Sequence, residues 1–250
     1  MARWTGLPAY LQIANDYRGR IFDGALPPGA KLPSESEVMA EYEVSRIVAR
    51  KAIEMLRNEG LIVSHTGKGS YVKQITRIVR DATTRYSRSA RSASPFANDA
   101  SRAGQGGGWD HESHRAKASA AVAERLMIAS GDPVMVTAYL FRAGAEPVQL
   151  STSYEPLEIT AGTSVEYPED GPVTGVIARM DTLGVHVDHV IERVTSRAAR
   201  PEEAERLHLT QPSQVMVVSR THHAGDRPVE TCDIVVPGDR YELSYRIDVH

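Results

Sequence analysis

The chain has 250 residues, enough for one large domain or two modest ones with packed cores. It contains no run of about 18 apolar residues. The N-terminal sequence lacks the basic and apolar regions of a signal peptide, so we expect a cytoplasmic protein without a membrane segment. Cys232 is the single cysteine, which excludes internal disulfides and cysteine-rich zinc sites. We expect it to be a small apolar residue inside a strand.

The net charge of -3 conceals an uneven distribution along the chain. Residues 1–80 contain 12 Lys and Arg against 8 Asp and Glu, whereas the remaining residues contain 17 against 24. The two parts therefore have opposite sign. This asymmetry fits a nucleic-acid-binding end joined to an acidic partner domain.

Two helices are predicted at the start of the chain. Residues 10–21 place apolar side chains at helical spacing, and Gly24 is a plausible stop. Ser34 stands three residues before Glu37, which is the pattern of a capping box at the start of a helix. This second helix is short and is expected to end near Tyr42.

The stretch VSRIVARKAI predicts a third helix with two different faces. Ser45 can cap its first turn, and Gly60 is expected to end it. Arg46, Arg50 and Lys51 lie on one side of this helix, and apolar side chains lie on the other. The apolar positions are Ile47, Ala49 and Ile53, followed by the inward-facing positions Val48, Ala52, Met55 and Leu56. The short connection to the second helix is typical of a helix-turn-helix.

The next stretch, LIVSHTGKGSYV, changes to an extended pattern. Residues 61–64 and 70–72 can pair as a hairpin around the tip residues 66–69. Three helices followed by such a hairpin describe a winged helix. We expect the third helix to enter the major groove of DNA, with Lys68 on the wing reaching the adjacent backbone or minor groove.

The motifs PAYLQIA, PPGAKLPSESE, VSRIVARKAI, NEGLI and GKGSYV occur in an order and spacing that resemble the DNA-binding domain of the GntR family of bacterial repressors. The resemblance covers residues 7–73 and implies a DNA-binding domain over residues 1–76. It implies that Arg46 and Arg50 contact guanines and that Gly67 approaches the DNA closely. The DNA-binding set is Ser34, Ser45, Arg46, Arg50, Lys51, Thr66, Gly67 and Lys68.

The composition changes after the wing. We expect a linker over residues 77–84 and a second domain over residues 85–250. Within it, residues 87–113 are rich in Ser, Arg and Gly and nearly devoid of aliphatic residues, so we expect a flexible segment. Trp109 and Phe96 are exceptions that can pin this segment down.

The remaining chain predicts short strands with intervening helices. Strands are expected at VMVTAYLF, PVQLSTSY, VHVDHVIERVTS, QVMVVSRTHH, RPVETCDIVV and YELSYRIDV, and helices at AVAERLMIA, PVTGVIARMDTLG and PEEAERLHL. AGAE and AGDR are predicted hairpin turns. The fold class is therefore α+β, with helices against an antiparallel sheet.

The phrases AGAEPVQLSTSYEP, PEEAERLHL and RTHHAGDRPVETCDIVVPGDRYEL resemble the UTRA effector-sensing domain of the HutC-type branch of the GntR family. The resemblance implies a fold similar to chorismate lyase, an effector pocket beside the sheet and a homodimer. The pocket residues would be Tyr139, Phe141, Ser153, Arg179 and Glu230. Tyr139 and Phe141 stand where sensors of sugar phosphates carry arginines, so a phosphate dianion is not the expected effector.

These patterns predict a transcriptional regulator, a repressor that binds double-stranded operator DNA and is modulated by a small molecule. An enzyme of chorismate-lyase-like fold fused to a DNA-binding domain is the alternative, although no nucleophile elbow, Walker loop or dinucleotide fingerprint occurs. A metal-responsive regulator is a further alternative, resting on His111, His114, His186, Asp188, His189, His222 and His223. These residues lack a converging set, and we expect no cofactor, no metal site and no catalytic residues. An architectural DNA binder without a ligand would leave the acidic domain with no role beyond dimerisation.

Overall fold

The computed structural model describes residues 6–74, 77–86, 94–171, 173–209, 212–247 and 249. The chain divides into an N-terminal unit, residues 1–75, and a C-terminal unit formed by residues 76–209 and 213–250. Within the described ranges, none of the helices combines the length and apolar character that a membrane crossing needs.

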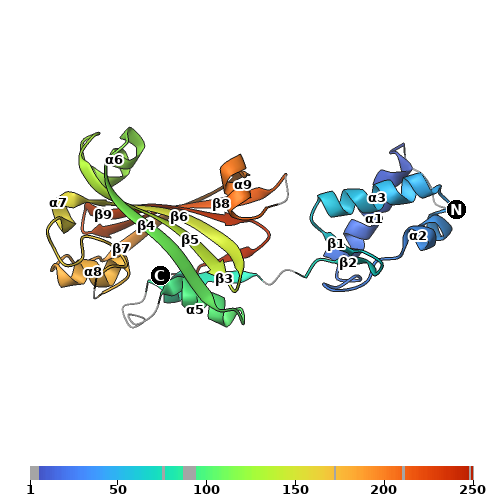
Figure 1. Ribbon diagram of the computed structural model, residues 1–250, viewed down its shortest axis with the longest axis horizontal. Coiled ribbons are helices and arrows are strands. Elements are labelled where there is room, and N and C mark those ends of the chain that lie inside the picture. Colours follow the sequence, from blue (N-terminus) through green and yellow to red (C-terminus); the bar gives the residue numbers. More distant parts are fainter. Residues whose placement is uncertain are drawn as a thin grey trace. The chain divides into compact units, whose positions relative to one another are not determined.

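The N-terminal unit is a winged helix (Figure 1). Its helices are α1 (Ala9–Phe22), α2 (Glu35–Tyr42) and α3 (Arg46–Asn58). The antiparallel strands β1 (Ile62–His65) and β2 (Gly69–Val72) form the wing. The Ser34 hydroxyl accepts the Glu37 N–H while the Glu37 carboxylate accepts the Ser34 N–H, so the predicted capping box is present.

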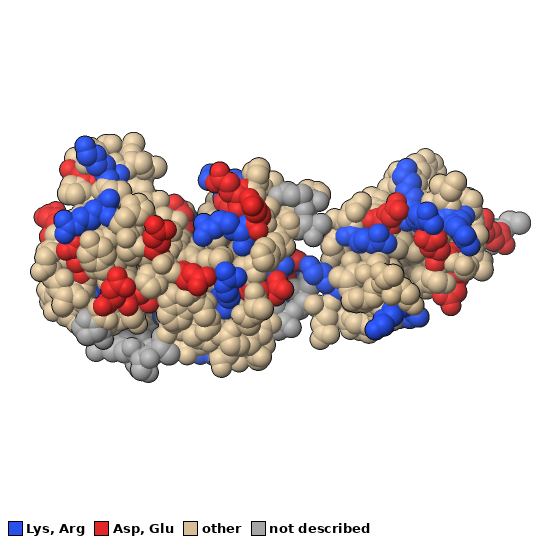
Figure 2. Space-filling model, in the orientation of Figure 1, with Lys and Arg blue, Asp and Glu red and all other residues tan. Residues whose placement is uncertain are grey.

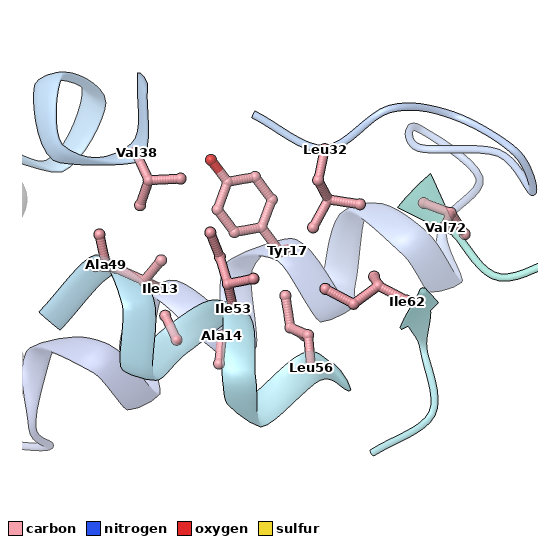
Figure 3. Packing of buried hydrophobic residues seen from close by; sticks show 11 residues of the cluster. Ile13, Ala14, Tyr17, Leu32, Val38, Ala49, Ile53, Leu56, Ile62 and Val72 are labelled. Carbon is pink, nitrogen blue, oxygen red and sulfur yellow. The ribbon is translucent and has the colours of Figure 1, made fainter. Parts of the chain in front are cut away.

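The small core of this unit lies between the three helices and the wing (Figure 3). Tyr17 of α1 stands among side chains from α2, α3 and the loop before α2, and its hydroxyl donates to Glu41 at 2.8 Å. The side chains of α3 in this core are Ala49, Ala52, Ile53 and Leu56. The helix face was therefore predicted well except at Ile47, which is 79% exposed and does not belong to the core. Val48 and Met55 are half-buried at its margin.

The C-terminal unit is built on a six-stranded antiparallel sheet in the order β4-β5-β6-β9-β8-β7, counted over the described residues. Its strands are β4 (Gly107–Lys117), β5 (Pro133–Ala143), β6 (Glu146–Pro156), β7 (His189–Ala198), β8 (Gln214–Ala224) and β9 (Arg227–Pro237). The predicted hairpins at AGAE and AGDR join β5 to β6 and β8 to β9.

Helices cover both faces of this sheet (Figure 1). One face packs against α6 (Ala120–Leu126) and α9 (Pro201–Arg206). The opposite face packs against α5 (Pro95–Arg102) and α8 (Val176–Thr182), while α7 (Leu157–Thr160) follows β6 directly. A parallel pair of short strands, β3 (Ile78–Asp81) and β10 (Tyr241–Ser244), adds Ile78 and Tyr241 to the core beside α5.

Two expectations about the middle of the chain were wrong. Residues 77–84 are not a bare linker, because β3 and the short helix α4 (Ala82–Arg85) occupy most of them. Most of residues 87–113 is also ordered, since α5 and the edge strand β4 lie there, and residues 87–93 lie outside the described residues. Phe96 is 2% exposed and packs α5 against the core. This one buried aromatic side chain supplies the apolar contact that aliphatic residues usually provide and that this segment lacks.

Candidate functional site

The exposed face of α3 is the first candidate site. Arg46, Ile47, Arg50, Lys51 and Glu54 line a shallow depression on this helix, and all five side chains are exposed. Figure 2 shows Lys and Arg side chains interspersed with acidic ones on the N-terminal unit. The face is therefore cationic at specific positions rather than uniformly basic.

The guanidinium of Arg50 is held by a neighbouring helix. Its Nε donates to Glu35 Oε1 at 3.1 Å, and the two side chains are 59% and 35% exposed. This contact uses Nε and leaves the two terminal nitrogens without a partner among the described residues. Lys51 Nζ lies 4.0 Å from the centre of the Tyr10 ring, in cation–π geometry.

The wing tip presents Thr66, Gly67 and Lys68 to solvent. The Lys68 N–H donates to the His65 carbonyl, which closes the turn, and Gly67 has φ +73°. A left-handed residue without a Cβ lets a neighbouring molecule approach the backbone closely. Unlike the wing-tip residues, Ser34 and Ser45 act as helix N-caps: each hydroxyl accepts a hydrogen bond from a backbone N–H of the helix that it precedes.

The second candidate site is a cavity of about 180 Å³ in the C-terminal unit, lined by the sheet, α5 and α8. Side chains alternate along a strand, so residues two apart on β6, β8 and β9 share its wall. The polar wall residues are Arg85, Tyr86, Gln149, Ser151, Ser153, Glu155, Arg179, Arg220, His222 and Glu230.

Glu230 is the centre of the polar wall. It is fully buried and accepts hydrogen bonds from Ser153 Oγ at 2.8 Å and from Arg220 at 2.8 Å, and it contacts His222 Nδ1 at 2.7 Å. Burial opposes ionisation of Glu230, but the Arg220 charge and these bonds lower its pKa to about 2. Burial and the Arg220 charge lower the pKa of His222, so its imidazole is neutral at pH 7.

An aromatic wall, formed by side chains from β4 and β5, is another part of the cavity lining. Tyr139 and Phe141 on β5 stack with ring centroids 5.4 Å apart, and Trp109 on β4 lies 6.1 Å from Phe141. Glu169 accepts hydrogen bonds from Trp109 Nε1 at 3.2 Å and from the Tyr139 hydroxyl at 3.4 Å. Burial and the Glu169 charge raise the pKa of Tyr139, so its hydroxyl keeps its proton.

All five residues predicted for the pocket line this one cavity: Tyr139, Phe141, Ser153, Arg179 and Glu230. Arg179 is nevertheless already engaged, because it pairs with Glu155 through two bonds and also donates to the Val165 carbonyl. The sequence reasoning missed Arg220, although the AGDR hairpin offered a signal. In that register Arg220 and His222 occupy alternate positions beside Glu230, so all three share one face.

The histidines considered as metal ligands do not gather. His222 is 3% exposed, and its Nδ1 contacts Glu230 at 2.7 Å inside the cavity wall. His189 and His223 stack with centroids 4.6 Å apart. In the part of the chain that the structure describes, no three His, Cys, Asp or Glu side chains form a group that can hold a metal ion.

Two family models match the chain. Residues 9–72 match bacterial regulatory proteins of the gntR family, and residues 111–242 match the UTRA domain. The first match covers the helices and wing of the N-terminal unit, and the second covers most of the six-stranded sheet and most of the cavity wall.

Whole-length relatives agree with this division. A crystal structure of a GntR-family transcriptional regulator is 42% identical, with 97% of this chain and 98% of that chain covered and a TM-score of 0.70. An uncharacterized HTH-type transcriptional regulator of Streptomyces coelicolor is 29% identical over 97% of this chain and 93% of its own. The histidine utilization repressor of Pseudomonas putida is 24% identical over 96% and 92%. The chain therefore belongs to the GntR family of transcriptional regulators and carries a UTRA domain.

Proposed function

We propose that this protein is a transcriptional repressor that binds operator DNA as a homodimer and responds to a small-molecule effector. The observation that carries the DNA-binding part is the joint exposure of Arg46, Arg50 and Lys51 on α3, a helix whose other face is buried. With Nε held by Glu35, Arg50 presents both terminal nitrogens for a bidentate contact with guanine O6 and N7. Lys68 at the wing tip is placed for a phosphate contact.

A twofold homodimer accounts for specificity. One winged helix reads only a few base pairs, whereas two copies related by a twofold axis read a pseudo-palindrome with a fixed half-site spacing. The names of two relatives support repression: one is a transcriptional repressor of Bacillus subtilis and the other is the histidine utilization repressor.

We assign the cavity to effector binding rather than catalysis. Burial raises the pKa of the Cys232 thiol to about 12, so it is not a thiolate at pH 7. Ser153 donates to Glu230, and Glu230 stands between Ser153 and His222. A histidine must contact the serine directly to act as its base, so this trio does not form a hydrolytic triad.

The test is selection of duplexes from a random pool by the full-length chain, followed by binding titrations. We expect a pseudo-palindromic consensus with a guanine in each half-site and two chains per duplex. Arg46→Ala and Arg50→Ala should each relax the preference at one guanine of the consensus, whereas the control Arg77→Ala, outside α3 and the wing, should leave the consensus unchanged. Enrichment of no sequence, or equal binding of consensus and scrambled duplexes, would refute the proposed function.

A further inference from the structure

The described lining of the cavity holds three arginines and three glutamates, so its formal charges balance in number but not in position. Three arginines are present, and each is paired: Arg85 with Asp99 at 2.5 Å, Arg179 with Glu155 at 2.6 Å and Arg220 with Glu230 at 2.8 Å. Each pair is neutral as a whole. His222 adds no charge at pH 7 because its pKa is lowered by burial and by Arg220.

Glu169 is the remaining charged residue of the wall. Its two hydrogen-bond donors, the Trp109 indole and the Tyr139 hydroxyl, are both neutral. The nearby His111 pairs with Asp170 instead, and no described Lys, Arg or His makes an ion pair with Glu169. Glu169 is therefore the charged residue of the described wall that lacks an ion-pair partner, and it places a negative charge at this position.

This charge stands beside the aromatic wall. Trp109, Tyr139 and Phe141 all line the cavity. The ring centroids of Tyr139 and Phe141 are 5.4 Å apart, and those of Trp109 and Phe141 are 6.1 Å apart. The faces of aromatic rings attract cations, and a carboxylate behind them adds to that attraction. A cation bound here would neutralise the half-buried Glu169 carboxylate, which has no ion-pair partner among the described residues.

We propose that the effector is a small organic cation whose positive group lies against Trp109, Tyr139 and Glu169. The inference rests on the proposed function, in which this cavity is the effector site. Strands β6 and β8 supply Ser151, Ser153 and Arg220 to the lining, and these side chains suit a hydroxyl or another hydrogen-bonding group on the same ligand. The volume of about 180 Å³ restricts the ligand to a compact molecule.

The test compares three probes of one shape and different charge on the full-length wild-type chain, by calorimetric titration without DNA. The probes are choline, its neutral carbon isostere 3,3-dimethylbutan-1-ol, and the anion 3,3-dimethylbutanoate. We expect choline to bind about tenfold or more tightly than the neutral isostere, as cation–π and charge contacts imply. The anion should be the weakest. Equal or tighter binding of the neutral or anionic probe, or no binding of choline at millimolar concentration, would overturn the proposal.

A pair of variants locates the cation. Glu169→Gln keeps the hydrogen-bonding shape and should weaken choline about tenfold without changing the neutral isostere. The control Glu146→Gln lies at the exposed start of β6 and should bind all probes as the wild type does. Unchanged choline affinity in Glu169→Gln would refute the site. Because no DNA is present, such a failure leaves the proposed DNA-binding function untouched, and the probe series needs no variant to fold.

Discussion

Glu230→Gln should destabilise the C-terminal unit, because the substitution preserves shape but removes the charge that neutralises Arg220. The Glu230 side chain is wholly buried, and that of Arg220 is 15% exposed, so water cannot replace the lost partner well. Removing one partner of a buried ion pair leaves the other charge uncompensated. Glu230→Gln is therefore a stability variant as well as an effector-site variant.

The magnitude follows from the pKa of Glu230. Burial opposes ionisation, but Arg220 and the hydrogen bonds hold this pKa at about 2, against 4.5 for an ordinary glutamate. The difference corresponds to about 3 kcal/mol of folding free energy. Since the folded pKa is depressed, this stabilisation is complete above pH 4.5 and is lost as the pH falls toward 2.

Urea unfolding followed by tryptophan fluorescence measures this loss. Trp4 and Trp109 are the two tryptophans, so a Trp4→Phe background makes Trp109 report on the C-terminal unit alone. At pH 7 we expect Glu230→Gln to lower the free energy of unfolding by about 3 kcal/mol, with a smaller difference at about pH 3. Glu146→Gln, at the exposed start of β6, should match the wild type. A Glu230→Gln variant as stable as the wild type at pH 7 would show that the Arg220 pair contributes nothing.

Three further predictions concern other parts of the molecule. Arg50→Ala should reduce the binding free energy for the selected duplex by about 1 to 3 kcal/mol and relax the preference for one guanine, whereas Lys68→Ala should weaken binding to all duplexes alike and reduce the salt slope by about one. Binding isotherms at several salt concentrations measure both effects, and equal losses on specific and random DNA would remove Arg50 from base readout. Gly107→Ala should lower the melting temperature, because a Cβ there would lie 2.8 Å from the Ala97 Cα, while Gly108→Ala meets nothing within 4 Å and should not; identical melting of the two variants would contradict this packing. Chymotrypsin should spare the bonds after Phe96 in α5 and after Trp109 in β4, and early cleavage there, detected by mass spectrometry, would restore the prediction that residues 87–113 are flexible.

The winged helix was predictable because its signals are local. Ser34 and Glu37 form a capping box within four residues, and the period of apolar side chains on α3 is set by the helix itself. Only Ile47 broke the pattern, because it lies on the exposed face of α3, with Arg50 three positions and Lys51 four positions later.

The regular secondary structure of residues 94–113 could not be predicted, because it depends on contacts with residues that are distant in the sequence. β4 is polar and mostly exposed, and it is held by pairing with β5 rather than by its own apolar residues. Amino-acid composition indicates how much apolar surface a segment can bury with its own side chains. An edge strand such as β4 buries little apolar surface and is held by backbone pairing with its neighbour, which composition does not reveal. Phe96 supplies the remaining anchor through contacts with Phe141, 45 positions later in the chain.

The cavity was predicted in part. Strand alternation places Tyr139 and Phe141 on one face, and hairpin register places Arg220 and His222 beside Glu230. Glu169 had no such signal, because it lies in an irregular segment after α7 and reaches Trp109 only through the tertiary fold. The Glu169 backbone has φ +71°, a left-handed conformation that is uncommon for residues other than glycine and is not predicted from the sequence.

The central claim is that occupancy of the cavity changes operator affinity, and one linkage measurement tests it directly. A compound that raises the melting temperature of the C-terminal unit is titrated into the free chain and into the chain saturated with the selected duplex. The account predicts that the compound lowers DNA affinity about 5- to 150-fold and that DNA lowers the affinity for the compound by the same factor. Equal affinity of the compound for the free and the DNA-bound chain would contradict it.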